Sequence, residues 1–144
     1  MRRLLPVLAA FLLLALTLPA CRPSEPLAPV EPYIELLSPA SNSIFSDSEV
    51  TVKTWVENLT LVDKVGQPNV PGEGHLIYYL DAMPPVMTGL TATPTSGTFV
   101  YSTEITHTWT GLAAGDHILA VQLVNNDNTP VRAPSAVYAY ITIK

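Results

Sequence analysis

Cysteine and basic residues are scarce in this chain of 144 residues. The single cysteine, Cys21, has no second cysteine to pair with, so a folded domain must be held by its core alone. Seven lysines and arginines stand against twelve aspartates and glutamates, and the formal net charge is −5. A surface with this balance repels nucleic acid and anionic lipid headgroups. We therefore expect no nucleic-acid partner.

Catalytic signatures are also absent. The sequence contains no GxSxG, HExxH, P-loop or GxGxxG pattern. Its carboxylates are scattered, so that Asp81, Asp116 and Asp127 could be paired only by the fold. From these absences we predict that the protein is not an enzyme.

One long and largely apolar run is present, from Leu4 to Leu18, directly after two arginines. Its fifteen residues fall short of the roughly 20 that a membrane span needs. A basic start followed by a short apolar run is typical of a secretory signal peptide. The run ends in LPAC, residues 18–21, which resembles the lipobox of bacterial lipoproteins, although Pro19 is an unusual occupant of its position. In that motif a small residue precedes the cut and the cysteine thiol receives the lipid.

We therefore predict cleavage after Ala20 and lipidation of Cys21, with an ordinary secretory signal or an uncleaved anchor as the alternatives. The partner is then the lipid bilayer, because two or three acyl chains hold a small domain far more firmly than one. The expected location is the cell membrane or outer membrane, facing the periplasm or the cell exterior. A lipidated Cys21 also rules out type 1 copper, which needs a cysteine thiolate. The mature chain keeps five basic and twelve acidic residues, a net charge of −7.

Prolines follow at every third position, at 23, 26, 29 and 32. This spacing favours polyproline II, which rises about 3 Å per residue and would form a semi-rigid tether. We assign residues 1–20 to the signal peptide, 21–32 to the lipidated cysteine and the Pro-rich tether, and 33–144 to one folded domain.

Short strands separated by Gly, Pro, Asn and Ser turns are predicted throughout the folded domain. The segment EVTVKTWVE, residues 49–57, alternates cleanly and places Val50, Val52, Thr54 and Val56 on one face. Further strands are predicted at residues 33–37, 75–81, 98–101, 105–110, 116–124 and 136–143. Such strands must each bury one face against a second sheet. The predicted fold is all-β, a single immunoglobulin-like or cupredoxin-like antiparallel β-sandwich of seven or eight strands.

Three histidines lie in or beside predicted strands: His75, His107 and His117. Strands distant in sequence can meet at one rim of a sandwich, and three neutral imidazoles are a natural site for copper or zinc. We therefore name these histidines as candidate metal ligands. The alternative is that each is a half-buried structural residue, hydrogen-bonded to a neighbour.

Two segments, GEGHLIYYLD (72–81) and THTWTGLAAGDHILAVQLVNNDNTP (106–130), carry a family resemblance. They resemble exported bacterial and archaeal β-sandwich proteins of unknown function. Members of that family have a Gly-His-x-His strand, a mid-chain histidine, a Pro-Gly-x-His turn and a closing Asn-Asp-His-x-Pro. The resemblance covers about residues 33–144, and His75, His107 and His117 match family histidines, whereas Ile77 and Asn128 replace two others. If the family histidines bind metal, either the remaining three suffice together with a nearby aspartate, or this site is lost.

On the last predicted strand, Tyr138 and Tyr140 point away from the core-facing positions. They form a candidate interaction surface for a glycan or a protein partner, although such tyrosines often only cover a sheet face. The oxygen-rich segment 125–128 lacks the carboxylates and the glycine of a calcium loop, so we predict a turn there.

Together these features predict a membrane-anchored, non-enzymatic binding module, with copper or zinc at the three histidines as its sharpest form. The alternative is an immunoglobulin-like adhesion, assembly or carbohydrate-binding surface module in which the histidines are structural.

Overall fold

The computed structural model describes residues 30–87, 89–132 and 135–144, and every regular element in these ranges is a β-strand. The predicted signal peptide, Cys21 and most of the tether lie outside the described residues. Within the described ranges, the chain forms no helix that is long and apolar enough to cross a membrane.

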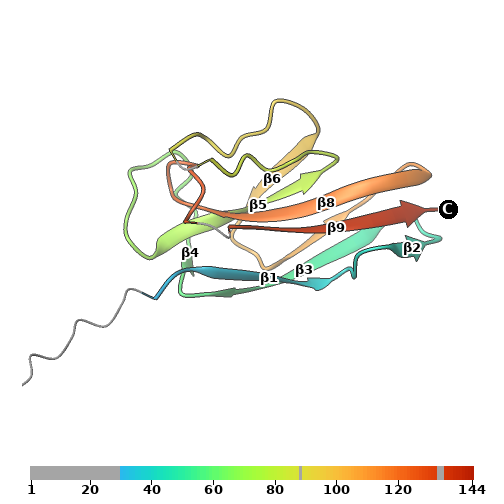
Figure 1. Cartoon of the computed structure of the whole chain (residues 1–144), viewed down its shortest axis with the longest axis horizontal. Coiled ribbons are helices and arrows are strands. Elements are labelled where there is room, and N and C mark those ends of the chain that lie inside the picture. Colours follow the sequence, from blue (N-terminus) through green and yellow to red (C-terminus); the bar gives the residue numbers. More distant parts are fainter. Residues whose placement is uncertain (1–29, 88, 133–134) are drawn as a thin grey trace, which may run out of the picture.

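Two sheets pack face to face, which confirms the predicted all-β sandwich (Figure 1). The smaller sheet has the strand order β1-β3-β7, with β1 at Tyr33–Ser38, β3 at Val50–Glu57 and β7 at Thr106–Trp109. The larger sheet has the order β2-β9-β8-β5-β4, and β6 also pairs with β5. Its strands are β2 at Ser43–Phe45, β4 at Thr60–Leu61, β5 at Glu73–Leu80, β6 at Thr98–Ser102, β8 at Gly115–Val124 and β9 at Ala136–Ile143.

The strand count and the pairing differ in part from the prediction. The described residues form nine strands rather than seven or eight, because β2 and β4 are additional. These two strands also run parallel to their neighbours, β9 and β5, so the larger sheet is mixed rather than purely antiparallel. Both are only two or three residues long, and both lie in segments whose composition favours turns.

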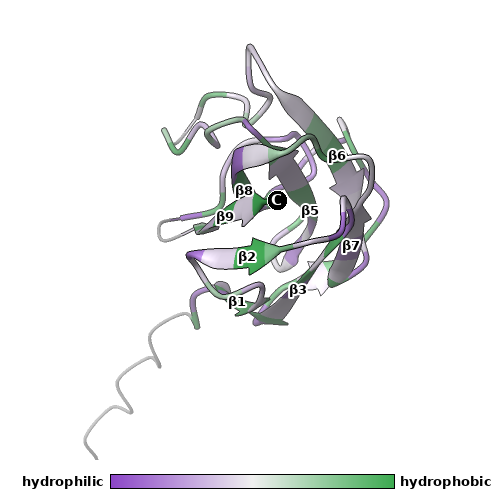
Figure 2. Cartoon of the chain, turned by 90° about the vertical axis from the view of Figure 1, so that its right-hand side faces the viewer, coloured by the Kyte–Doolittle hydropathy of each residue, from purple (hydrophilic) through white to green (hydrophobic). Residues whose placement is uncertain are grey.

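The main core lies between the two sheets and follows the alternation seen in the sequence. On β3, Val50, Val52 and Thr54 are each 1% exposed, as the valine-rich face predicted. On β9, Ile141 and Ile143 face the same core. Figure 2, which views the molecule from the end where β9 finishes, shows the two sheets as layers on either side of this interior.

A second core covers the opposite face of the larger sheet. Ile77 and Tyr79 of β5 are fully buried there, although their neighbours Leu76 and Tyr78 already fill the main core. The cover is the long connection 81–97 in its described parts, 81–87 and 89–97, which contribute Ala82 and Ala92 and lie over β5 and β8 in Figure 1. The sandwich therefore has a third, irregular layer over part of one sheet.

Gly74 allows β5 to approach β8 closely. A Cβ atom at this position would overlap the backbone carbonyl oxygen of Val124. The glycine that precedes His75 in the sequence is thus required by packing between two central strands.

The two ends of the sandwich are distinct. At one end the chain enters β1, where Tyr33 pairs with Glu57 at the close of β3. At the other end β8 begins and β9 finishes, with Gly115 paired to Ile143 (Figure 1). The start of β1 and the last residues of the chain therefore lie at opposite ends of the molecule.

Candidate functional site

The three candidate metal ligands do not meet. His75 pairs with Val124 at the end of β8, whereas His117 lies near the start of β8 and pairs with Ile141. Along β8, the position paired with His75 (Val124) lies seven residues after His117, which is roughly 23 Å at 3.3 Å per residue. His107 lies on β7 in the other sheet. Among the described residues, no group of three or more His, Cys, Asp or Glu side chains could hold a metal ion.

The predicted copper or zinc site at His75, His107 and His117 is therefore wrong. Its physical premise was that strand-end histidines share one rim, but the strand order places them at two ends and in two sheets.

His75 and His107 are packed among aromatic side chains, and only His75 makes a side-chain hydrogen bond to a neighbour among the described residues, so the alternative fits them in part. His75 is buried, its Nε2 lies 3.0 Å from Asn128 Oδ1, and its ring meets Tyr101 edge to face. His107 packs against the rings of Tyr78 and Trp109. Burial lowers the pKa of both imidazoles, so both are neutral at pH 7. Asn128 is thus a direct neighbour of the His75 ring.

His117 has a different environment, because both of its ring nitrogens face acceptors. Nδ1 lies 2.9 Å from Asp81 Oδ2, and Nε2 lies 2.8 Å from the carbonyl oxygen of Ala113. A carbonyl and a carboxylate can only accept, so both contacts are hydrogen bonds only when both ring nitrogens carry protons, and the site favours the imidazolium form. The hydrogen bond to Ala113 raises the pKa of His117 most, and Asp81 raises it further.

Asp81 completes this arrangement, which we call the His117 clamp (Asp81, Ala113 and His117). Its other carboxylate oxygen, Oδ1, accepts a hydrogen bond from the backbone N–H of Ile118 at 3.1 Å. Asp81 directly follows β5 with a positive φ of 53°. The clamp therefore ties the end of β5 to the start of β8.

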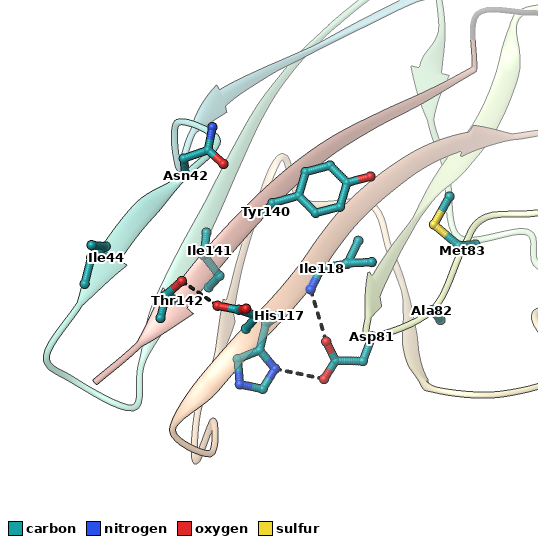
Figure 3. A pocket seen from close by; sticks show the side chains of 11 residues that line it. Asn42, Ile44, Asp81, Ala82, Met83, His117, Ile118, Tyr140, Ile141 and Thr142 are labelled. Atoms are coloured by element: carbon teal, nitrogen blue, oxygen red, sulfur yellow. Dashed lines mark hydrogen bonds and ion pairs between the residues drawn. The ribbon is translucent and has the colours of Figure 1, made fainter.

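Beside the clamp lies a groove with a volume of about 650 Å³ (Figure 3). Its floor is formed by the start of β8 and the end of β9. Met83 from the connection 81–97 and Ile44 from β2 lie on opposite sides of this floor in Figure 3. The lining residues are Asn42, Ile44, Asp81, Ala82, Met83, Asp116, His117, Ile118, Tyr140, Ile141 and Thr142.

The groove combines exposed apolar groups with a few polar ones. Ile44 is 59% exposed, Met83 58% and Tyr140 51%, which is unusual for large apolar side chains gathered at one place. Figure 3 shows the Tyr140 ring lying across the sheet with its face toward the viewer. Asp116 is also exposed, and its Oδ1 accepts a hydrogen bond from the Thr142 hydroxyl at 2.7 Å.

The two tyrosines of the predicted interaction surface lie in different environments. Tyr140 lines the groove, whereas Tyr138 is half-buried and packs against the second core. Both point to the outer face of β9, as their alternation predicted, but only Tyr138 joins the second core.

Several groove residues carry no signal in the sequence. Ile44 lies in a turn-rich segment and Met83 in a proline-rich one, where single apolar residues are common. Asp81 directly follows a predicted strand, but its pairing with His117 depends on the long-range register between β5 and β8. The one local hint was His117 at the start of a strand after a Gly-Asp pair.

No family model matches the chain, and no curated protein matches it. Among solved structures, the crystal structure of an engineered protein, determined at 1.98 Å by the Northeast Structural Genomics Consortium, is similar. It has a TM-score of 0.43 and 14% sequence identity over 81% of this chain, which spans 21% of that structure's length.

Proposed function

We propose that this protein is a lipid-anchored extracytoplasmic module that binds a ligand in the groove beside the His117 clamp and is not an enzyme. The groove itself carries the proposal, because it gathers large exposed apolar side chains around a few polar groups in a concave site. Binding pockets for small molecules have this composition and a volume of about 300–1,000 Å³.

The proposed anchor would leave the groove accessible. The groove lies where β8 begins and β9 ends, opposite to the point where the chain enters β1. A chain held to a bilayer through Cys21 would therefore present the groove away from the membrane. A binding site at this end would be accessible from the surrounding medium.

The hydrogen bonding of the clamp supports a structural role for His117 rather than a role as a general base. Both nitrogens of His117 and both oxygens of Asp81 already have partners within the protein. A general base needs a free lone pair within reach of the substrate, and the imidazolium form of His117 offers none. The clamp instead shapes the groove by fixing the two strands that border it.

A different surface supports the alternative of an immunoglobulin-like adhesion or carbohydrate-binding module. The outer face of β1 and β3 exposes Tyr33, Leu37 and Trp55 beside two charged residues, Glu35 and Lys53. Flat sheet faces that carry aromatic rings suit stacking against sugars or protein partners. This face lies on the smaller sheet, so binding here would be separable from binding in the groove.

Fragment screening by two-dimensional NMR on the chain from residue 22 onward tests the proposal. This chain contains all nine strands, whose pairings lie within residues 33–143. We expect fragments with an apolar ring to shift the amide signals of Ile118 and Tyr140, and Tyr140→Ser to remove these shifts. Tyr33→Ser, on the other sheet, is the matched control and should leave them unchanged. Amide shifts confined to β1 and β3 would refute the groove as the binding site and favour the outer face of β1 and β3.

A further inference from the structure

We infer that the ligand of the groove is a small organic cation with an apolar body, such as an arylalkylamine. This inference rests on the proposed function and names the chemical class of the ligand. Three properties of the groove carry it: the sign of its exposed charges, the apolar surface beside them, and its size.

The exposed charges of the groove are negative. Asp116 is exposed, and the Asp81 side chain is 47% exposed, whereas the side chain of His117 is only 11% exposed. The lining contains no lysine or arginine. A ligand in the groove therefore meets two carboxylates, while the one compensating cation lies beneath the surface and is already paired with Asp81.

The two carboxylates differ in what they can offer. Asp81 uses one oxygen for His117 and the other for the Ile118 amide. Asp116 uses Oδ1 for the Thr142 hydroxyl, which leaves Oδ2 to accept a charge-assisted hydrogen bond from an ammonium group. Asp116 is thus the expected direct contact, and Asp81 contributes its charge.

Apolar and aromatic groups lie within the same groove. Tyr140 presents a ring face, which attracts both an apolar ring and a nearby cation. Ile44 and Met83 flank the groove with exposed aliphatic surface. An inorganic cation would leave the aliphatic surface of Ile44 and Met83 without a partner, and a neutral apolar molecule would leave the carboxylates without one.

The size of the groove favours a small molecule over a macromolecular surface. Eleven residues line it, with a volume of about 650 Å³. A stable protein interface involves about 20–30 residues on each side, which is more than the groove supplies. A ligand with one ring and a short aminoalkyl chain matches this volume.

Isothermal titration of the chain from residue 22 onward with tryptamine, tryptophol and indole-3-acetate tests the inference. These probes share an indole ring and differ in charge, being cationic, neutral and anionic. We expect tryptamine to bind about tenfold tighter than tryptophol, and indole-3-acetate to bind most weakly. Tryptamine affinity should also fall as the salt concentration rises, because the attraction is partly screened.

Variants locate the contact. Asp116→Asn retains an acceptor for Thr142 but removes the charge, and it should weaken tryptamine about tenfold while leaving tryptophol unchanged. Glu35→Gln removes an exposed carboxylate from the other sheet and should change neither affinity.

Three results would overturn the inference while leaving the proposed function standing. In the first, tryptophol binds in the groove as tightly as tryptamine, so charge does not select the ligand. In the second, the peptide acetyl-Trp-Lys-amide binds there and tryptamine does not, which would make the groove a docking site for a basic protein segment. In the third, none of the indole probes binds, which would refute the inference that the ligand is an organic cation. The proposed function itself fails only when the fragment screen finds no ligand in the groove.

Discussion

At the scale of single residues, the charge state of the histidines follows from their hydrogen-bond partners. His117 faces two acceptors, which raise its pKa above the ordinary value of about 6.5. A raised folded-state pKa adds stability that is fully present below about pH 6.5 and is lost as the pH rises through the folded pKa. His75 and His107 behave oppositely, because burial lowers their pKa and their protonation in acid favours unfolding.

Asp81→Asn should therefore destabilise the protein in acid and have little effect in base. Asparagine suits the positive φ of this position and can still accept from the Ile118 amide, so the change removes mainly the charge. We expect a loss of about 1 kcal/mol near pH 5.5, as for other partly exposed ion pairs, shrinking toward zero near pH 9. Urea unfolding at several pH values measures the difference between variant and wild type.

The difference between variant and wild type is the quantity to measure. In the wild type alone, His75 and His117 change the free energy of unfolding in opposite directions as the pH falls, so their contributions partly cancel. In a His117→Gln background the same Asp81→Asn change should cost equally little at every pH. A loss that stays constant from pH 5.5 to pH 9 in the wild-type background would show that His117 is not charged in the clamp.

At the scale of elements, the long strands were predictable and the short ones were not. Alternation marked β3 and β9, since one face of each packs in the main core and the other does not. In β5 both faces are buried. Its run of large side chains, LIYYL at residues 76–80, is consistent with burial on both faces. The run does not indicate which segment covers the second face. β2 and β4 rely on parallel pairing with distant strands, for which local sequence gives no signal.

The site was predictable only where a residue's role is local. Alternation on β9 placed Tyr140 on the outer face, and the structure puts it in the groove. The three histidines were grouped because all lay near strand ends, but which ends coincide depends on strand order. The clamp depends on the register that brings Leu80 opposite Leu119, a long-range pairing that one sequence does not specify.

A buried polar network holds the connection 81–97 against the larger sheet, in addition to the apolar contacts of Ala82 and Ala92. The Tyr79 hydroxyl lies 2.8 Å from the Ala92 carbonyl and 2.7 Å from Gln122 Oε1, so its one proton can serve either acceptor. Gln122 in turn donates from Nε2 to the Pro85 carbonyl at 2.8 Å. Both side chains are fully buried, which makes an unmade hydrogen bond here costly.

Tyr79→Phe should loosen this connection and destabilise the protein by about 1–3 kcal/mol, because two buried acceptors lose their shared donor. Faster hydrogen exchange at the Ala92 amide, which donates to the Asn128 carbonyl, would report the local effect. Tyr33→Phe removes an exposed hydroxyl and should leave stability and exchange unchanged. Equal effects of the two changes would mean that the network does not hold the connection.

At the scale of the whole molecule, the end at which the chain enters from the proposed anchor is opposite to the end that carries the groove. Thr60 follows β3 near the point where the chain enters, and Ala114 directly precedes β8 at the groove end. Each is exposed and can carry a label. If lipid on Cys21 holds the protein to a bilayer, the label at position 60 lies on average nearer to the membrane than the label at position 114.

Quenching measurements on the lipidated protein in vesicles check this orientation. A fluorophore attached at Thr60→Cys should be quenched more strongly by a headgroup-linked quencher than one at Ala114→Cys, since native Cys21 is then blocked by lipid and takes no label. The same chains carrying Cys21→Ala should not sediment with vesicles, which tests the anchor itself. Stronger quenching at position 114 would place the groove against the membrane, and the ligand would then have to come from the lipid surface rather than from the surrounding medium.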